Sequence, residues 1–304
     1  MKTKLRIIVL VALAISVIAI EAASFIQKSG KEKMDPAQPK PKTSLNAYSF
    51  NAPLRDKSMD LDDLLEYCAA RDFDAVDITA YYFPGYPEVP SDEYLYHIKQ
   101  KAFKLGLGIS GTGVRNDFTN PDPEQRAADV ELVKKWILAA EKLGAPVIRV
   151  FAGKSNTEGY TREEVLNWLL TDLRECVEFG KEHGVMIGIQ NHNDFIENAD
   201  QVIEIIEKVD SDWIGLILDT GSFRTGDSYA QIEKSIPYAI NWQIKTKIYM
   251  DGAEEDIDLH RLFGIIKASG YRGYIPIETL DPADPLTLVD QFLSEVVKAL
   301  EEVY

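Results

Sequence analysis

Cysteine and histidine are scarce in this chain of 304 residues, which narrows the metal and redox chemistry open to it. The two cysteines, Cys68 and Cys176, fall in stretches with helical periodicity and are predicted to be buried, unpaired thiols. Both lie far from the N-terminus, which excludes a lipidated N-terminal cysteine. Three of the four histidines, His97, His183 and His260, also lie in predicted helices and are interpreted as structural.

Basic residues are outnumbered as well. The chain has 33 lysines and arginines against 49 aspartates and glutamates, which gives a formal net charge of -16. A surface with this balance repels nucleic-acid phosphates and anionic lipid. The composition therefore argues against a nucleic-acid partner.

The apolar run near the N-terminus, from Ile7 to Ile20, is too short for a typical membrane span. It has 14 residues, which suits the hydrophobic part of a signal peptide. Three basic residues precede it, but an acid, Glu21, stands where a cleavage site favours a small residue. Residues 1–23 are therefore predicted to be a signal peptide or an uncleaved N-terminal anchor. The protein is expected to be exported, periplasmic or membrane-tethered, with membrane contact only through such an anchor.

Lysine, proline, glutamine and serine dominate the next segment, and residues 24–43 are predicted to be a flexible linker. The remaining residues, 44–304, number about 260, which is a usual size for one (β/α)8 barrel and too short for two. Apolar residues make up 45% of the chain, enough for a large core.

From residue 45 onward, short apolar runs alternate with longer stretches of helical periodicity. The predicted strands are Leu45–Phe50, Ala75–Thr79, Leu107–Gly111, Val147–Phe151, Met186–Asn191, Ile214–Asp219, Trp242–Ile248 and Tyr274–Thr279. The predicted helices span residues 60–71, 91–105, 123–143, 161–183, 197–208, 228–239, 255–268 and 286–302.

Strict alternation of strands and helices predicts a parallel sheet, because each crossover returns the chain to the same end of the sheet. Eight such units close most readily into a single-domain (β/α)8 barrel, or TIM barrel. An open doubly wound sheet is the alternative. It needs a glycine-rich turn after the first strand, and Asn51-Ala-Pro-Leu54 provides none.

Charged side chains end the later strands, at the end of a barrel where active sites lie. Asp219 and Glu278 end or nearly end the predicted sixth and eighth strands, and Lys245 lies in the seventh. Burying such charges unpaired is costly, so we expect them to meet one another, a metal or a ligand. A turn cap for Asp219 and a structural salt bridge between Glu278 and Lys245 stay open as alternatives.

Strand alternation groups further polar residues with these. Gln243, Lys245 and Lys247 are predicted to share one face of the seventh strand, and Gln190 shares a face with His192. A backbone-bonded core or loop histidine is the alternative for His192, and a solvated lysine is the alternative for Lys247.

Asp77, in the second predicted strand, is a candidate for substrate binding. Tyr81 follows it in an aromatic loop that is expected to lie over the barrel mouth. Aromatic rings at such a position stack on sugar faces or form a hydrophobic lid over the core.

Five segments of the chain together resemble the xylose isomerase-like TIM barrels, over about residues 45–302. They are Ala75-Val-Asp-Ile78, Val147-Ile-Arg-Val-Phe-Ala-Gly153, Gly184-Val-Met-Ile-Gly-Ile-Gln-Asn-His192, Leu218-Asp-Thr-Gly221 and Ile275-Pro-Ile-Glu278. That superfamily includes ketose epimerases, inosose dehydratases, hydroxypyruvate isomerase and the family-2 AP endonucleases. The resemblance implies a small-molecule carbohydrate as substrate. It points to the following binding residues: Asp77, Tyr81, Arg149, Asn191 and Lys247.

Members of this family typically bind one divalent metal through a Glu, an Asp, a His and a second Glu. These positions fall on Gln190, Asp219, Gln243 and Glu278, so glutamine replaces the first Glu and the His. Ser222 also stands where a histidine often lies. Two carboxylates and two amide oxygens favour Mn²⁺ or Mg²⁺ over Zn²⁺ as the implied metal.

The departures also affect the chemistry that the resemblance implies. Ketose epimerisation uses two proton-transfer groups on opposite faces of a carbon, and of the family's two glutamates this chain keeps Glu278. Glu278 is therefore the predicted base, with Lys245 or a metal stabilising the enolate and His192 as a second proton donor. If no metal binds, Lys245 is the natural replacement.

The resemblance thus implies a carbohydrate isomerase or epimerase that acts on a small sugar or keto-sugar derivative through an enediolate. A keto-sugar lyase or dehydratase is one alternative, and a non-catalytic sugar-binding descendant with a degenerate metal site is another. An AP endonuclease is disfavoured, because those enzymes use a histidine-rich site with three zinc ions.

Overall fold

The computed structural model describes residues 39–154 and 157–304. The fold lies in the compact unit Lys40–Tyr304. The predicted signal or anchor segment and most of the predicted linker lie outside the described residues. In the part of the chain that is described, no helix is long and apolar enough to cross a membrane.

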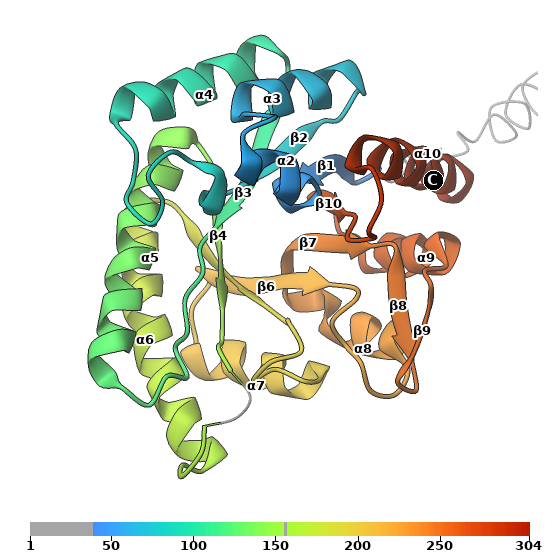
Figure 1. Ribbon diagram of the computed structural model, residues 1–304. Coiled ribbons are helices and arrows are strands. Elements are labelled where there is room, and N and C mark those ends of the chain that lie inside the picture. The colour runs from blue at the N-terminus through green and yellow to red at the C-terminus, as the bar shows by residue number, and fades with distance from the viewer. Residues whose placement is uncertain (1–38, 155–156) are drawn as a thin grey trace, which may run out of the picture. The chain divides into compact units, whose positions relative to one another are not determined.

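Eight parallel strands close into a barrel in the order β1-β10-β7-β6-β5-β4-β3-β2 (Figure 1). The first strand pairs with both the second and the last, which removes every open edge. The predicted (β/α)8 fold is therefore confirmed. The strands are β1 Lys42–Asn46, β2 Ala75–Thr79, β3 Gly108–Gly113, β4 Val147–Phe151, β5 Met186–Gln190, β6 Ile214–Asp219, β7 Ala239–Lys245 and β10 Tyr274–Glu278.

Helices follow the strands and cover the outside of the barrel (Figure 1). Their apolar faces pack onto strands whose residues are almost all buried, as in β6. Thr161 makes a capping box with Glu164 at the start of α6. The helices are α2 Asn51–Asp56, α3 Leu61–Ala70, α4 Asp92–Lys104, α5 Pro123–Leu143, α6 Arg162–Glu182, α7 Ala199–Val209, α8 Ser228–Ser235, α9 Leu259–Ser269 and α10 Pro285–Val303.

The first strand begins earlier than predicted. It starts at Lys42 and ends at Asn46, and a 3-10 turn at Ala47–Phe50 replaces the rest of the predicted strand. The Thr43 backbone N–H donates to the Asp74 carboxylate at 2.8 Å, which holds the start of β1 next to the start of β2. Residues 42 and 43, assigned to the linker from composition, therefore belong to the barrel.

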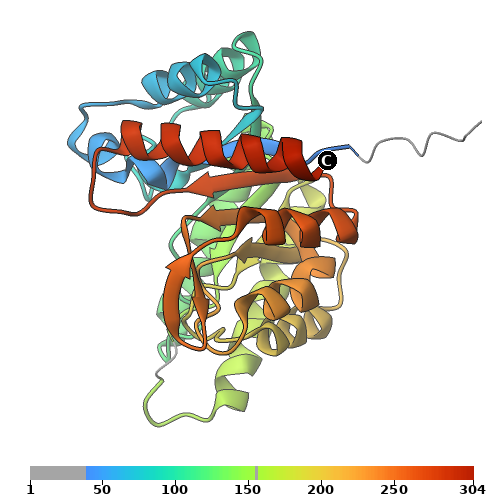
Figure 2. The same cartoon turned by 90° about the vertical axis from the view of Figure 1, so that its right-hand side faces the viewer.

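The predicted seventh strand, Trp242–Ile248, is two separate strands. Strand β7 ends at Lys245, and the chain then leaves the barrel and forms an antiparallel hairpin of β8 Lys247–Met250 with β9 Ala253–Asp256. Figure 2 shows this hairpin as a ribbon outside the barrel. The prediction that Lys247 shares a face with Lys245 is therefore wrong, because the bend at Thr246 ends the alternation.

Candidate functional site

A cavity of about 640 Å³ opens at the carboxyl ends of the barrel strands. Its walls include the last residues of β1, β2, β5, β7 and β10, and loops after β3, β4 and β5 complete them. This is the end of the barrel where the sequence predicts the site. The lining side chains include Asn46, Thr79, Tyr81, Arg149, Gln190, His192, Gln243, Lys245 and Glu278.

Four neighbouring strands bring five predicted residues together at the floor of this cavity. The Gln190 amide donates to Asp219 Oδ2 at 2.8 Å and to Gln243 Oε1 at 2.7 Å. The Lys245 Nζ lies 3.4 Å from Asp219 Oδ2 and also contacts Glu278 Oε2. Burial alone would lower the pKa of Lys245, but the two carboxylates more than offset it and raise that pKa above its ordinary value. Lys245 is therefore a fixed ammonium between two buried acids.

Asn191 supports this cluster from behind. Its side chain is buried, accepts from the Asp219 backbone N–H at 2.8 Å and donates to the Asp219 carbonyl at 2.9 Å. Asn191 therefore joins the end of β5 to the end of β6. The residues that line the cavity do not include it, although the resemblance assigns it to substrate binding.

Arg149, the middle residue of β4, also lines the cavity. Its guanidinium donates to the Val114 carbonyl at 2.6 Å and to the Tyr81 hydroxyl at 2.9 Å. It also lies 4.1 Å from the centre of the Phe151 ring. The structure thus places both Arg149 and Tyr81 on the cavity wall, as expected of residues that touch a ligand.

His192 lines the cavity with its side chain half exposed. Burial lowers the pKa of His192. The negative charge of Asp219 opposes this change, and the positive charges of Arg149 and Lys245 add to it. The imidazole is therefore neutral at pH 7. Its ring also packs against Phe151, with the two ring centres 4.6 Å apart.

Besides Asn191, two more predicted binding residues lie away from the cavity wall. Asp77 is buried inside the barrel, where its carboxylate lies 3.4 Å from the Asn241 amide nitrogen, and it does not line the cavity. Lys247 is on the hairpin and pairs with Asp256. The structure therefore gives neither of them a direct route to a ligand in this cavity.

Three acidic residues of the cavity wall are not predicted from the sequence. Asp117, Asp129 and Asp194 line it from the loop after β3, from α5 and from the loop after β5. Burial raises the pKa of Asp194 to about 7 against the effect of three backbone hydrogen bonds. The signal that could have found two of them is their place in loops that follow strand ends.

The residues at the cavity floor do not fit a divalent ion as they are arranged. A metal would need the carboxylate oxygens of Asp219 and Glu278, and the Lys245 ammonium lies against both. The Gln190 nitrogen, not its oxygen, faces Asp219 and Gln243. Within residues 39–154 and 157–304, no group of three or more His, Cys, Asp or Glu side chains could hold a metal.

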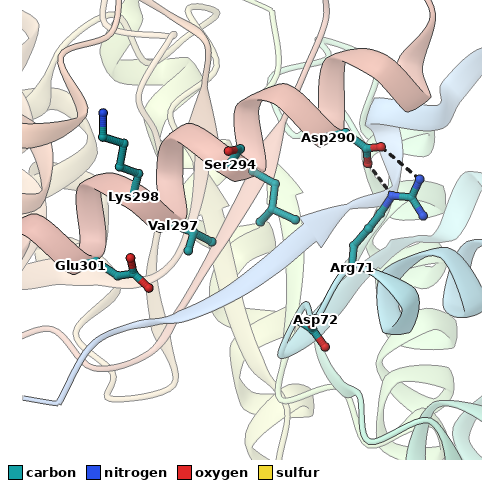
Figure 3. Close-up of a pocket in the computed structure, with 8 residues that line it drawn as sticks. Arg71, Asp72, Asp290, Ser294, Val297, Lys298 and Glu301 are labelled. Atoms are coloured by element: carbon teal, nitrogen blue, oxygen red, sulfur yellow. Dashed lines mark hydrogen bonds and ion pairs between the residues drawn. The ribbon is translucent and has the colours of Figure 1, made fainter.

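A second hollow lies on the outside of the barrel, between the loop after α3 and helix α10 (Figure 3). Its main polar feature is the pair between Arg71 and Asp290, in which Asp290 also accepts from the Tyr67 hydroxyl at 2.6 Å. These contacts join helices α3 and α10. We therefore interpret this hollow as a seam between helices.

Comparisons with known proteins agree with the fold and the resemblance. A family model described as Xylose isomerase-like TIM barrel matches residues 65–295. An inosose isomerase from Halalkalibacterium halodurans is 25% identical over 240 residues, which cover 72% of this chain and 82% of that protein.

Solved structures show the same barrel. A structure of L-ribulose 3-epimerase matches with a TM-score of 0.72 and 20% identity, covering 86% of this chain and 95% of its own. The IOLI protein with a binding zinc atom matches with a TM-score of 0.66 and 19% identity, covering 86% and 97%. At these identities the structural matches establish the fold alone.

Proposed function

The chain belongs to the xylose isomerase-like TIM barrel family, and on that basis we propose that it is a carbohydrate isomerase or epimerase acting on a small sugar or keto-sugar derivative. The inosose isomerase relative and the epimerase with the same fold support this substrate class. The observation that carries the proposal is the pairing of Glu278 with the Lys245 ammonium at the floor of an open, polar cavity.

Isomerisation of a keto-sugar begins with removal of a proton from the carbon beside the carbonyl. Glu278, at the end of β10, is the base in this proposal. The developing negative charge on the substrate oxygen needs a fixed positive group in a place with little water. Lys245 provides that group, since its ammonium is held beside Glu278 and Asp219.

The proton must also return to the substrate. His192 lines the same cavity, but as a neutral imidazole it is a weak acid at pH 7. The simplest course is therefore that Glu278 returns the proton to the former carbonyl carbon, while the proton of the neighbouring hydroxyl passes to the former carbonyl oxygen. This one-base scheme suits an isomerisation better than an epimerisation, because an epimerisation requires proton transfer on opposite faces of one carbon.

The positive charge at the site comes from Lys245 in this proposal, so no step needs a divalent ion. Gln190 then acts as a hydrogen-bonding amide that holds Asp219 in place, and Gln243 accepts a hydrogen bond from Gln190. Asp219 in turn holds the ammonium next to Glu278.

Solvent exchange tests the proposal whatever the product is. Inososes, ketopentoses and ketohexoses are incubated with the enzyme in D₂O, and loss of the proton beside the carbonyl is followed by NMR. We expect exchange with the unaltered enzyme and a loss of at least about a hundredfold in Glu278→Gln. Glu295→Gln, an exposed glutamate on α10, is the matched control and should keep full exchange.

The alternatives give other results in the same screen. A lyase or dehydratase would release water from the sugar, and a non-catalytic binding protein would bind a sugar without exchange. The names of the relatives give no support to either. Absence of both exchange and isomerised product with every sugar, with the protein folded, would count against the proposal.

A further inference from the structure

Arg149 is a buried cation that has no acidic partner in the described part of the chain. Its side chain belongs to a residue only 6% exposed. No carboxylate of residues 39–154 and 157–304 forms an ion pair with it within 4.0 Å. Buried arginines are nearly always paired, because an unpaired charge loses its hydration without compensation. The missing partner therefore needs an explanation.

The surroundings hold the guanidinium in one position with neutral groups. The Val114 carbonyl and the Tyr81 hydroxyl accept from its two terminal nitrogens, at 2.6 and 2.9 Å. The ring of Phe151 lies beneath it. A Cβ atom at Gly113 would lie 2.8 Å from the Arg149 Nε, so glycine at this position leaves the space that the guanidinium fills. The arrangement is that of a built site.

Donor capacity remains for a ligand. A guanidinium has five N–H donors, and these two contacts use only part of that number. Arg149 lines the same cavity as Lys245 and Glu278. A ligand that reaches the cavity floor can therefore also reach this wall.

The charges inside the protein do not supply the counter-ion. Burial raises the pKa of Asp77 and the positive charge of Arg149 opposes that rise, but the Asp77 carboxylate accepts a hydrogen bond from Asn241 and forms none with Arg149. Lys245 and not Arg149 takes the contacts with Asp219 and Glu278. The place beside Arg149 is thus left for a negative group that enters with a ligand.

We propose that Arg149 binds an anionic group of the substrate, a carboxylate or a phosphate, so that the substrate is an acidic sugar derivative. The inference rests on the proposed function for the sugar part of the ligand. A guanidinium donates two parallel hydrogen bonds to a carboxylate or phosphate, which fixes the orientation of the bound molecule. The anion would then hold the other end of the sugar toward Glu278.

Binding of probes, without turnover, tests the inference. Calorimetric titrations compare D-glucuronate, D-glucose and inorganic phosphate at constant ionic strength on the unaltered protein, in which Lys245 stays paired with Glu278. We expect glucuronate, phosphate or both to bind saturably and glucose to bind at least about tenfold more weakly. Binding by glucuronate alone identifies a carboxylate ligand, and binding by phosphate alone identifies a phosphate ligand.

Two variants then assign the contact. Arg149→Met should weaken binding of the preferred anion by about ten- to hundredfold, as expected for the loss of charge-assisted hydrogen bonds. Tyr81→Phe keeps the guanidinium and removes only a neutral acceptor, so its effect should be smaller. If Arg149→Met does not fold, the comparison of charged and neutral probes on the parent protein still decides.

The outcomes separate this inference from the proposed function. Equal binding of glucuronate and glucose, no binding of either anion, or unchanged anion binding in a folded Arg149→Met protein overturns the role of Arg149. Such a result leaves the exchange assay with Glu278 unaffected. Anion binding without any sugar exchange would instead support the anion site and reject the isomerase proposal.

Discussion

Lys245 lies between two buried acids at the cavity floor, Asp219 and Glu278, and contacts both. Its replacement by methionine keeps the length of the side chain but leaves Asp219 and Glu278 facing each other without a cation. We expect Lys245→Met to lower the free energy of unfolding by about 3–5 kcal/mol, the usual cost of breaking a buried ion pair. The measurement is urea unfolding followed by circular dichroism.

Lys247→Met is the matched control, because that lysine forms a solvent-exposed pair with Asp256 on the hairpin. Exposed pairs contribute about 0–1 kcal/mol, so the control should unfold almost as the parent does. A similar, small effect of both substitutions would contradict the role of Lys245. Stabilisation of the parent by Mn²⁺, reversed by a chelator, would contradict the metal-free site.

Asp77 makes one of the pH-dependent contributions to the stability of the fold. Burial raises its pKa to about 7 from an ordinary value of 3.8, although Arg149 opposes the change. Between these pH values the folded state keeps the proton and the unfolded state does not. The stability that this group contributes is therefore complete below about pH 4 and is lost as the pH rises toward 7.

Asp77→Asn imitates the protonated carboxyl at every pH. We expect it to stabilise the protein relative to the parent by a few kcal/mol, to order of magnitude, at pH 8 and by much less at pH 4. Urea unfolding of both proteins across this range measures the difference. Asp212→Asn, an exposed aspartate, should show no such trend. A gain that does not change with pH would mean that Asp77 is not the titrating group.

The observed bounds of a helix or strand match the predicted ones where the hydrophobic pattern allows only one interpretation. Helix α5 spans residues 123–143, as its periodicity predicts, because Pro123 begins it and the left-handed Gly144 ends it. The seventh strand is not predictable in the same way. Its apolar alternation continues past Lys245 into the hairpin, and nothing in that pattern marks the exit from the barrel.

The site likewise contains residues that can be predicted from the sequence and residues that cannot. Residues at strand ends, such as Gln190 and Asp219, can be placed together from sequence because parallel strands bring their carboxyl ends to one rim. For Asp117 and Asp194 the sequence offers only a place in loops after strand ends, and their reach into the cavity depends on tertiary contacts rather than on periodicity. The sequence predicts the ion pair of Lys245 as an alternative to a metal, but its geometry follows only from the structure.

At the scale of the whole molecule, closure of the sheet determines which residues are required for folding. Strand β1 begins at Lys42 and pairs with β2 and β10, so the barrel closes with residues that start there. The export signal or anchor proposed for residues 1–23 and most of the linker after it then lie before the folding unit. This gives a prediction about truncation.

A chain that begins at Lys40 should fold with the unfolding midpoint of the full-length protein, because every strand and helix of the barrel is retained. A chain that begins at Ala47 is the matched control. It lacks β1, leaves β2 and β10 with open edges, and should fail to unfold cooperatively or should aggregate. Thermal unfolding and size-exclusion chromatography of the two chains measure both outcomes. If the chain from Lys40 is unfolded, residues before it take part in the core. If the chain from Ala47 folds as well as the longer one, closure through β1 contributes little to stability.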